Sequence, residues 1–158
     1  MNHFVEVYTD GSCHTQLCLG AWASVILIDD QKVVLSGTEN ETTHNRMEIL
    51  AVINSIKYLR THYKTVTKFK IISDSQYVIG LVEREPKFIY NSFITKAGKE
   101  IRNADLVREL LELLKVLTIE FVKIKAHQKQ TDTINYNIEV DKLSRKLVRG
   151  LADAKQKI

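Results

Sequence analysis

Four carboxylates in this sequence have the residue type and spacing to form a reaction centre. Asp10 is the last residue of an alternating segment, residues 4–10, that we predict to be a short strand ended by Gly11. Asp74 comes directly after another predicted strand, residues 68–73. If these strands are adjacent and parallel, both carboxylates lie at the sheet edge where ligands bind in open α/β sheets.

Glu48 and Asp141 are expected near the same edge, each in the first turn of a predicted helix. Four clustered carboxylates repel one another unless cations neutralise them. Hard divalent cations prefer oxygen ligands, and Mg²⁺ is the usual choice beside phosphates. Two such ions about 4 Å apart form a clamp for in-line displacement at phosphorus. The pattern therefore indicates metal-dependent phosphoryl-transfer chemistry.

Each carboxylate also has a purely structural interpretation. These are a hairpin turn at Asp10-Gly11, a capping box between Asn45 and Glu48, an N-cap at Asp74, and an ion pair between Asp141 and Arg145. None of them explains why all four residues would meet in one place, although the meeting is itself inferred from the order of the elements.

The elements that must position these residues follow from the hydrophobic periodicity. Strands are predicted at residues 4–10, 20–28, 32–37, 68–73 and 118–125. Helices are predicted at residues 45–60, 76–83, 105–114 and 138–154, with an exposed, partly helical excursion at 84–99 and a polar loop at 126–137. A meander followed by helix-linked strands predicts an α/β domain with a mixed sheet, in which the first, fourth and fifth strands are parallel.

Length and composition fit a single globular domain over residues 1–158. Hydrophobic residues make up 44% of the chain and charged residues 27%, which is typical of a protein with a sizeable core. The sequence has no membrane-spanning run and no signal-peptide pattern, so we expect a cytoplasmic protein without membrane association. Cys13 and Cys18 are expected to be reduced thiols, and they form no zinc pattern with the five histidines.

The net charge of +4 is mild, but the basic residues concentrate in two segments, 84–102 and 142–158. Such local excess is compatible with a polyanionic partner and does not establish one.

Four segments, taken in order, resemble the motifs of type 1 ribonuclease H. They are Tyr8–Cys13 (YTDGSC), Thr42–Glu48 (TTHNRME), Ser73–Val78 (SDSQYV), and Lys125–His127 followed by Asp141–Ser144. The match extends from Tyr8 to about Val148. It implies a ribonuclease H-like fold, a five-stranded mixed sheet flanked by helices. It also implies endonucleolytic hydrolysis of the RNA strand of RNA–DNA hybrids, leaving 5′-phosphate and 3′-hydroxyl ends.

The same resemblance implies the cofactors and the catalytic residues. Asp10, Glu48, Asp74 and Asp141 match the residues that bind two Mg²⁺ ions, for which Mn²⁺ usually substitutes. One ion activates the attacking water and the other stabilises the leaving 3′-oxygen. His127 matches a catalytic histidine on a mobile loop that assists proton transfer or product release. Its alternative interpretation is a surface histidine on a polar loop.

Substrate-binding residues are implied at nine positions: Gly11, Ser12, Cys13, Thr43, His44, Asn45, Gln76, Asn103 and Asn137. Cys13, Asn45 and Gln76 match positions that touch the hybrid backbone and minor groove, where contacts can read the 2′-hydroxyl. Thr43 and Asn103 match positions near a phosphate of the DNA strand. Each of these two also has a plain interpretation as a cap or turn residue.

The sequence departs from the family pattern mainly around the substrate. His44 stands where an asparagine is usual, and the loop at 13–20 is not glycine-rich. The excursion at 84–99 resembles the family's basic protrusion in position, but it carries Phe88, Tyr90 and Phe93 instead of tryptophans. These changes bear on binding of the DNA strand rather than on the chemistry.

The leading hypothesis is a free-standing, monomeric, Mg²⁺-dependent ribonuclease H that acts on RNA–DNA hybrids. A start Met just before the first strand and a short tail argue against an appended hybrid-binding domain. They leave open that the chain is a domain excised from a reverse transcriptase polyprotein. Two further alternatives are a nuclease of the same fold that cuts double-stranded RNA or DNA junctions, and a catalytically silent hybrid-binding module. The intact acidic set argues against the silent module.

Overall fold

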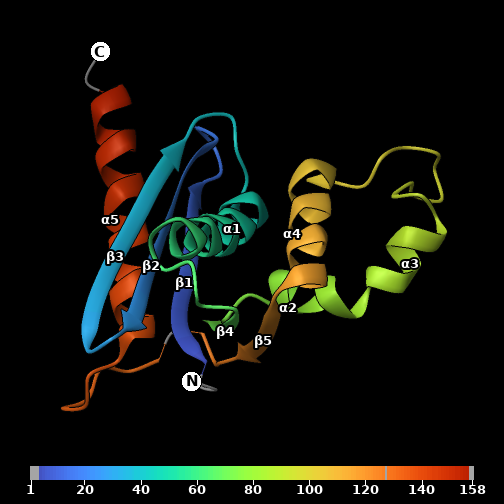
Figure 1. Cartoon of the computed structure of the whole chain (residues 1–158). Helices are drawn as coiled ribbons and strands as arrows, with labels where there is room; N and C mark the ends of the chain where they lie inside the picture. Colours follow the sequence, from blue (N-terminus) through green and yellow to red (C-terminus); the bar gives the residue numbers. More distant parts are fainter. Residues whose placement is uncertain (1–3, 127, 157–158) are drawn as a thin grey trace.

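The computed structural model describes residues 4–126 and 128–156, which contain one five-stranded sheet and five helices (Figure 1). The strands are β1 (Val5–His14), β2 (Leu19–Ile28), β3 (Gln31–Glu39), β4 (Lys68–Ser73) and β5 (Thr118–Lys123). The helices are α1 (His44–His62), α2 (Gln76–Glu83), α3 (Glu85–Tyr90), α4 (Ala104–Val116) and α5 (Tyr136–Gln156).

The strands lie side by side in the order β3-β2-β1-β4-β5. β1, β2 and β3 form an antiparallel meander, whereas β1 pairs with β4, and β4 with β5, in the parallel direction. The helical connections into β4 and β5 account for the parallel pairing, because parallel neighbours need a crossover. The predicted mixed sheet with parallel first, fourth and fifth strands is confirmed.

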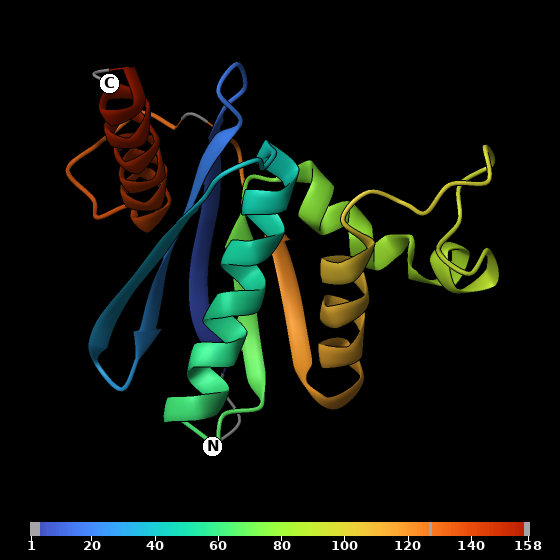
Figure 2. The same ribbon diagram turned by 90° about the horizontal axis from the view of Figure 1, so that it is seen from above.

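Helices cover both faces of the sheet, and α1 and α4 lie next to each other on one of them (Figure 2). Ile26 and Ile28 of β2 pack into the large core under these two helices. The alternate residues Ala23 and Val25 pack with Val140 of α5 on the opposite face. Because successive strand residues point to opposite faces, a strand buried on both sides must be apolar throughout, which explains the continuous apolar run of β2.

The segment between α2 and α4 projects away from the sheet (Figure 1). It contains α3, whose last residue Tyr90 is 88% exposed, and then an irregular stretch. Phe88 and Phe93 stack with ring centroids 6.2 Å apart, and Arg108 of α4 lies 4.1 Å from the Phe93 ring centroid. The predicted exposed, partly helical excursion is therefore confirmed.

Several predicted boundaries are wrong for identifiable reasons. β1 does not end at Gly11 but continues to His14, because its pairing with β2 runs on to the His14–Leu19 pair. Asp10 and Gly11 therefore lie inside a strand and do not form a hairpin turn. α5 begins at Tyr136, before the predicted start, so Asp141 lies in its second turn.

Two predicted helix caps are also wrong. The N-cap of α1 is Thr43, whose hydroxyl accepts a hydrogen bond from the Arg46 backbone N–H at 3.2 Å, so Asn45 is not the cap. Glu48 then lies in the second turn rather than in a capping box. The N-cap of α2 is Ser75, whose hydroxyl accepts from Val78, so Asp74 is not used as a cap. Neither Glu48 nor Asp74 is needed to begin its helix.

No helix in the described ranges combines the length and apolar character needed to span a bilayer.

Candidate active site

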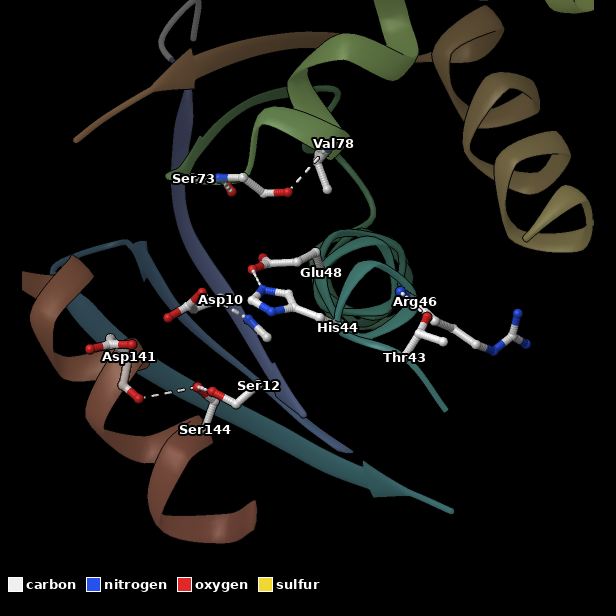
Figure 3. Close-up of polar contacts among 12 residues, drawn as sticks. Asp10, Ser12, Thr43, His44, Arg46, Glu48, Ser73, Val78, Asp141 and Ser144 are labelled. Atoms are coloured by element: carbon white, nitrogen blue, oxygen red, sulfur yellow. Dashed lines mark hydrogen bonds and ion pairs between the residues drawn. The ribbon is translucent and has the colours of Figure 1, made fainter. Parts of the chain in front are cut away.

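Three carboxylates from separate elements converge at one end of the sheet. Asp10 comes from β1, Glu48 from α1, and Asp74 from the residue directly after β4. Each offers an oxygen atom that lies within 4.8 Å of the other two. Figure 3 shows the Glu48 side chain extending from α1 toward Asp10 on β1. We call these three residues the acidic cluster.

Strand register places Asp10 and Asp74 at the same level. Tyr8 of β1 is the parallel partner of Ile72 in β4, and two further residues along each chain lead to Asp10 and Asp74. Parallel strands advance together, so residues equally far beyond a paired position stay close.

Gly11 allows Glu48 to reach the cluster. A Cβ atom at residue 11 would lie 2.7 Å from the Glu48 backbone nitrogen and 2.8 Å from the Met47 carbonyl carbon. Both distances are shorter than side-chain carbons tolerate, so any other residue would push the start of α1 away from β1. Gly11 therefore acts as a spacer between helix and strand, and its contact with substrate stays a prediction.

The acidic cluster is buried, and its charges are coupled. Asp10 is 3% exposed and Glu48 is 2% exposed. Burial, followed by the charges of Glu48 and Asp74, raises the pKa of Asp10 to about 10. Burial and the charge of Asp74 raise the pKa of Glu48 to about 8. In the absence of a cation, the cluster therefore retains protons at neutral pH.

The donor set fits a hard divalent cation. Three carboxylates supply oxygen ligands at close range, which is the chemistry that Mg²⁺ and Mn²⁺ prefer. Glu48 Oε1 lies 2.8 Å from His44 Nε2, but the buried Glu48 Oε2 has no hydrogen-bond partner among the described residues. A buried carboxylate oxygen without a partner is costly, and a cation ligated there would satisfy it.

Asp141 approaches the acidic cluster from α5, on the other face of the sheet (Figure 3). Its carboxylate lies 3.1 Å from Arg145 Nε, so the predicted ion pair is present. That pair does not isolate Asp141, because Asp141 also raises the pKa of Asp10, to a smaller extent than burial, Glu48 and Asp74 do. Asp141 is thus placed beside the cluster but outside its three closest oxygens.

A pair of serines joins the strand of Asp10 to the helix of Asp141. The Oγ atoms of Ser12 and Ser144 are 2.9 Å apart, and Ser144 Oγ also donates to the Asp141 carbonyl at 3.1 Å. Ser144 is completely buried. Sequence reasoning missed its role, although a serine on the buried stripe of α5 between Val140 and Val148 is a detectable signal.

The other predicted substrate residues are spread around this centre. Asn45 and Gln76 are exposed in the first turns of α1 and α2. Cys13 lies beside the start of α1, where its Sγ donates to the Thr42 carbonyl at 3.6 Å. Asn137 is 4% exposed, and its side-chain oxygen has no hydrogen-bond partner in the described part of the chain. His127 lies outside the described residues.

Thr43 and Asn103 precede two neighbouring helices, α1 and α4. Asn103 adopts a left-handed backbone conformation with φ 57° and donates from its side-chain nitrogen to the Tyr77 hydroxyl at 3.2 Å. The helix starts are joined by a two-pronged ion pair, in which Arg46 reaches both carboxylate oxygens of Asp105 at 3.1 and 2.9 Å. The structural cap role considered for Thr43 is confirmed.

Comparison with known proteins agrees with the motifs. The family model described as RNase H matches residues 2–149. Ribonuclease H from Caldicellulosiruptor saccharolyticus is 35% identical over 149 residues, covering 93% of this chain and 97% of that protein. Ribonuclease H from Wolbachia pipientis wMel is also 35% identical, over 91% of this chain and 94% of its own length. The chain therefore belongs to the ribonuclease H family.

Proposed function

We propose that this ribonuclease H hydrolyses the RNA strand of RNA–DNA hybrids with Mg²⁺, leaving 5′-phosphate and 3′-hydroxyl ends. The observation that carries the proposal is the acidic cluster, because three mutually repelling carboxylates with oxygens within 4.8 Å have no structural use without a cation. Family membership supports the hybrid as the substrate class.

In this proposal Asp10, Glu48, Asp74 and Asp141 hold two Mg²⁺ ions, with Mn²⁺ as a substitute. When bound, the ions supply activation of the attacking water and stabilisation of the leaving 3′-oxygen. The protein's part is to fix the ligands before substrate arrives. The Gly11 backbone N–H donates to Asp10 Oδ1 at 2.9 Å, and His44 orients Glu48. Such held ligands reduce the reorganisation needed during reaction.

We assign proton transfer or product release to His127, on the basis of its motif alone. In the sequence it follows Lys125 and Ala126, shortly after β5 ends at Lys123. An imidazole suits this role because its pKa lies close to neutral pH.

Substrate contacts are proposed on both sides of the acidic cluster. Asn45 and Gln76 are exposed amides at the starts of α1 and α2, where they can reach a minor groove and its 2′-hydroxyls. Gly11, Ser12, Cys13, His44 and Asn137 complete the proposed surface for the cut strand. Thr43 and Asn103 precede α1 and α4, whose starts are held together, and adjacent helix starts favour a phosphate of the DNA strand.

We further propose that residues 1–158 act as a single ribonuclease H domain, as a monomer in the cytoplasm. Cys13 and Cys18 are free thiols, which suits a reducing compartment. Size-exclusion chromatography with light scattering tests the monomer.

The test of the function is cleavage of an RNA–DNA hybrid labelled on the RNA strand, with Mg²⁺, Mn²⁺ or EDTA. Asp74→Asn removes one charge of the cluster at nearly constant shape and should abolish cleavage. Asp153→Asn, an exposed carboxylate near the end of α5, is the matched control and should cut normally. Double-stranded RNA and a DNA junction run beside the hybrid, and preferential cutting of either would replace the proposed substrate. Hybrid binding without cutting would indicate a silent binding module.

A further inference from the structure

A cavity of about 350 Å³ opens beside the acidic cluster, between the β1–β2 hairpin and α5. Its lining carries two guanidinium groups and an imidazole but no carboxylate: Ser12, Cys13, His44, Arg145, Val148 and Arg149. The cavity is therefore the cationic neighbour of a strongly anionic site. A polyanion crossing the carboxylates would meet opposite charge here.

The two arginines of the cavity are not equivalent. Arg145 has its Nε 3.1 Å from the Asp141 carboxylate, so much of its charge is used within the site. Arg149 lies one helical turn further along α5 and is exposed. Among the described residues, it makes no hydrogen bond and no ion pair. Arg149 is the cation of this cavity that remains available to a ligand.

We propose that Arg149 binds a phosphate of the strand being cut, beside the scissile phosphate on the side facing the β1–β2 hairpin. This inference rests on the proposed function and adds a phosphate contact to it. Arg149 is eight residues after Asp141, which corresponds to about 12 Å along the helix axis. That displacement suits a neighbouring phosphate rather than the one being hydrolysed. A planar guanidinium can also bind two phosphate oxygens at once.

The cavity walls explain why the contact would be specific to this side. Ser12 on one wall is held by Ser144, and Cys13 is held against Thr42, so the part of β1 that lies opposite Arg149 is fixed. His44, with its side chain 60% exposed, stands at the end nearest Glu48. An RNA strand leaving the acidic cluster would pass His44 and then reach Arg149.

The test compares Arg149→Ala and Arg149→Lys with Lys146→Ala. Lys146 is an exposed cation on the same helix that does not line the cavity. We expect Arg149→Ala to raise KM for the hybrid about tenfold while kcat changes less than twofold, because a charge-assisted contact is lost. The plot of log KM against log salt concentration should lose about one unit of slope. Arg149→Lys should recover the salt slope, and Lys146→Ala should match the parent protein.

Hybrids shortened from either end locate the contact. Removing nucleotides on one side of the cut should erase the difference between the parent protein and Arg149→Ala, whereas shortening the other side should preserve it. If both truncations preserve the difference, Arg149 does not contact a neighbouring phosphate.

The inference and the proposed function fail in different ways. If the parent protein cuts hybrid and Arg149→Ala behaves like Lys146→Ala, the phosphate contact is refuted and the function stands. Hybrid affinity is also measured in the Asp74→Asn background, with and without Arg149→Ala. Loss of affinity and salt slope there would support the contact even if no protein cut the hybrid, and unchanged affinity would refute it.

Discussion

Asp10→Asn should stabilise the metal-free protein while abolishing hybrid cleavage. The oxygens of Asp10, Glu48 and Asp74 lie within 4.8 Å of one another. At an effective dielectric constant of about 20, two full charges at this distance repel by about 3.5 kcal/mol. Asparagine keeps the oxygen that accepts from the Gly11 N–H, and its amide can donate to Glu48. Because protonation already relieves part of the repulsion, we expect a net gain of about 2–3 kcal/mol.

The assay is thermal and urea unfolding in EDTA, with Asp153→Asn as the matched control. For a protein of this size, the gain corresponds to a Tm increase of roughly 4–12 °C. Added Mg²⁺ should stabilise the parent protein more than the variant, because binding to the folded state adds free energy according to ligand affinity. A variant that is no more stable in EDTA than Asp153→Asn would refute the repulsion argument.

The raised pKa of Asp10 makes the stability of the metal-free protein depend on pH. The pKa of Asp10 is raised from 3.8 to about 10 in the folded protein. Between these values the folded state holds a proton that the unfolded state has released, so metal-free stability falls as pH rises. One such group contributes a loss of about 1.4 kcal/mol per pH unit. Asp10→Asn should flatten this decline between pH 5 and 9, and an unchanged slope would contradict the raised pKa.

Three other changes test how the site is held. Gly11→Ala should destabilise the protein by about 2–3 kcal/mol in urea unfolding and reduce cleavage, because its Cβ meets the α1 backbone; a neutral effect would refute the close approach. Ser144→Ala should lower the free energy of unfolding by about 1 kcal/mol and raise the Mg²⁺ concentration needed for half-maximal activity. Ser12→Ala should give a similar shift. A loss of stability with no change in the Mg²⁺ requirement would show that the serine pair does not position Asp141. Arg46→Ala should raise KM for the hybrid more than Asp105→Asn does, because the arginine substitution leaves the Asp105 carboxylate unpaired beside the proposed DNA phosphate. A KM for Arg46→Ala equal to that of the parent protein would contradict the role of this ion pair.

Much of the fold could be predicted from the sequence because its signals are local. Alternation in β1, the apolar run of β2 and the helical stripes of α1 and α4 follow from which residues each element must bury. Helix and strand ends were less predictable. Thr43 and Ser75 are the N-caps of their helices, where a neighbouring residue was predicted. β1 extends to His14 because its residues pair with β2 up to that point.

The sequence alone was enough to name the four carboxylates as candidates, since their motifs occur in order at family spacing. Only the tertiary structure decided how they meet. Asp10 lies within a strand rather than at its end, and Gly11 lets α1 bring Glu48 beside it. The role of Ser144 and the availability of Arg149 were likewise decided by tertiary contacts. Residue type and periodicity are properties of short segments, whereas strand register, helix approach and competition for ion-pair partners depend on residues far apart in the chain.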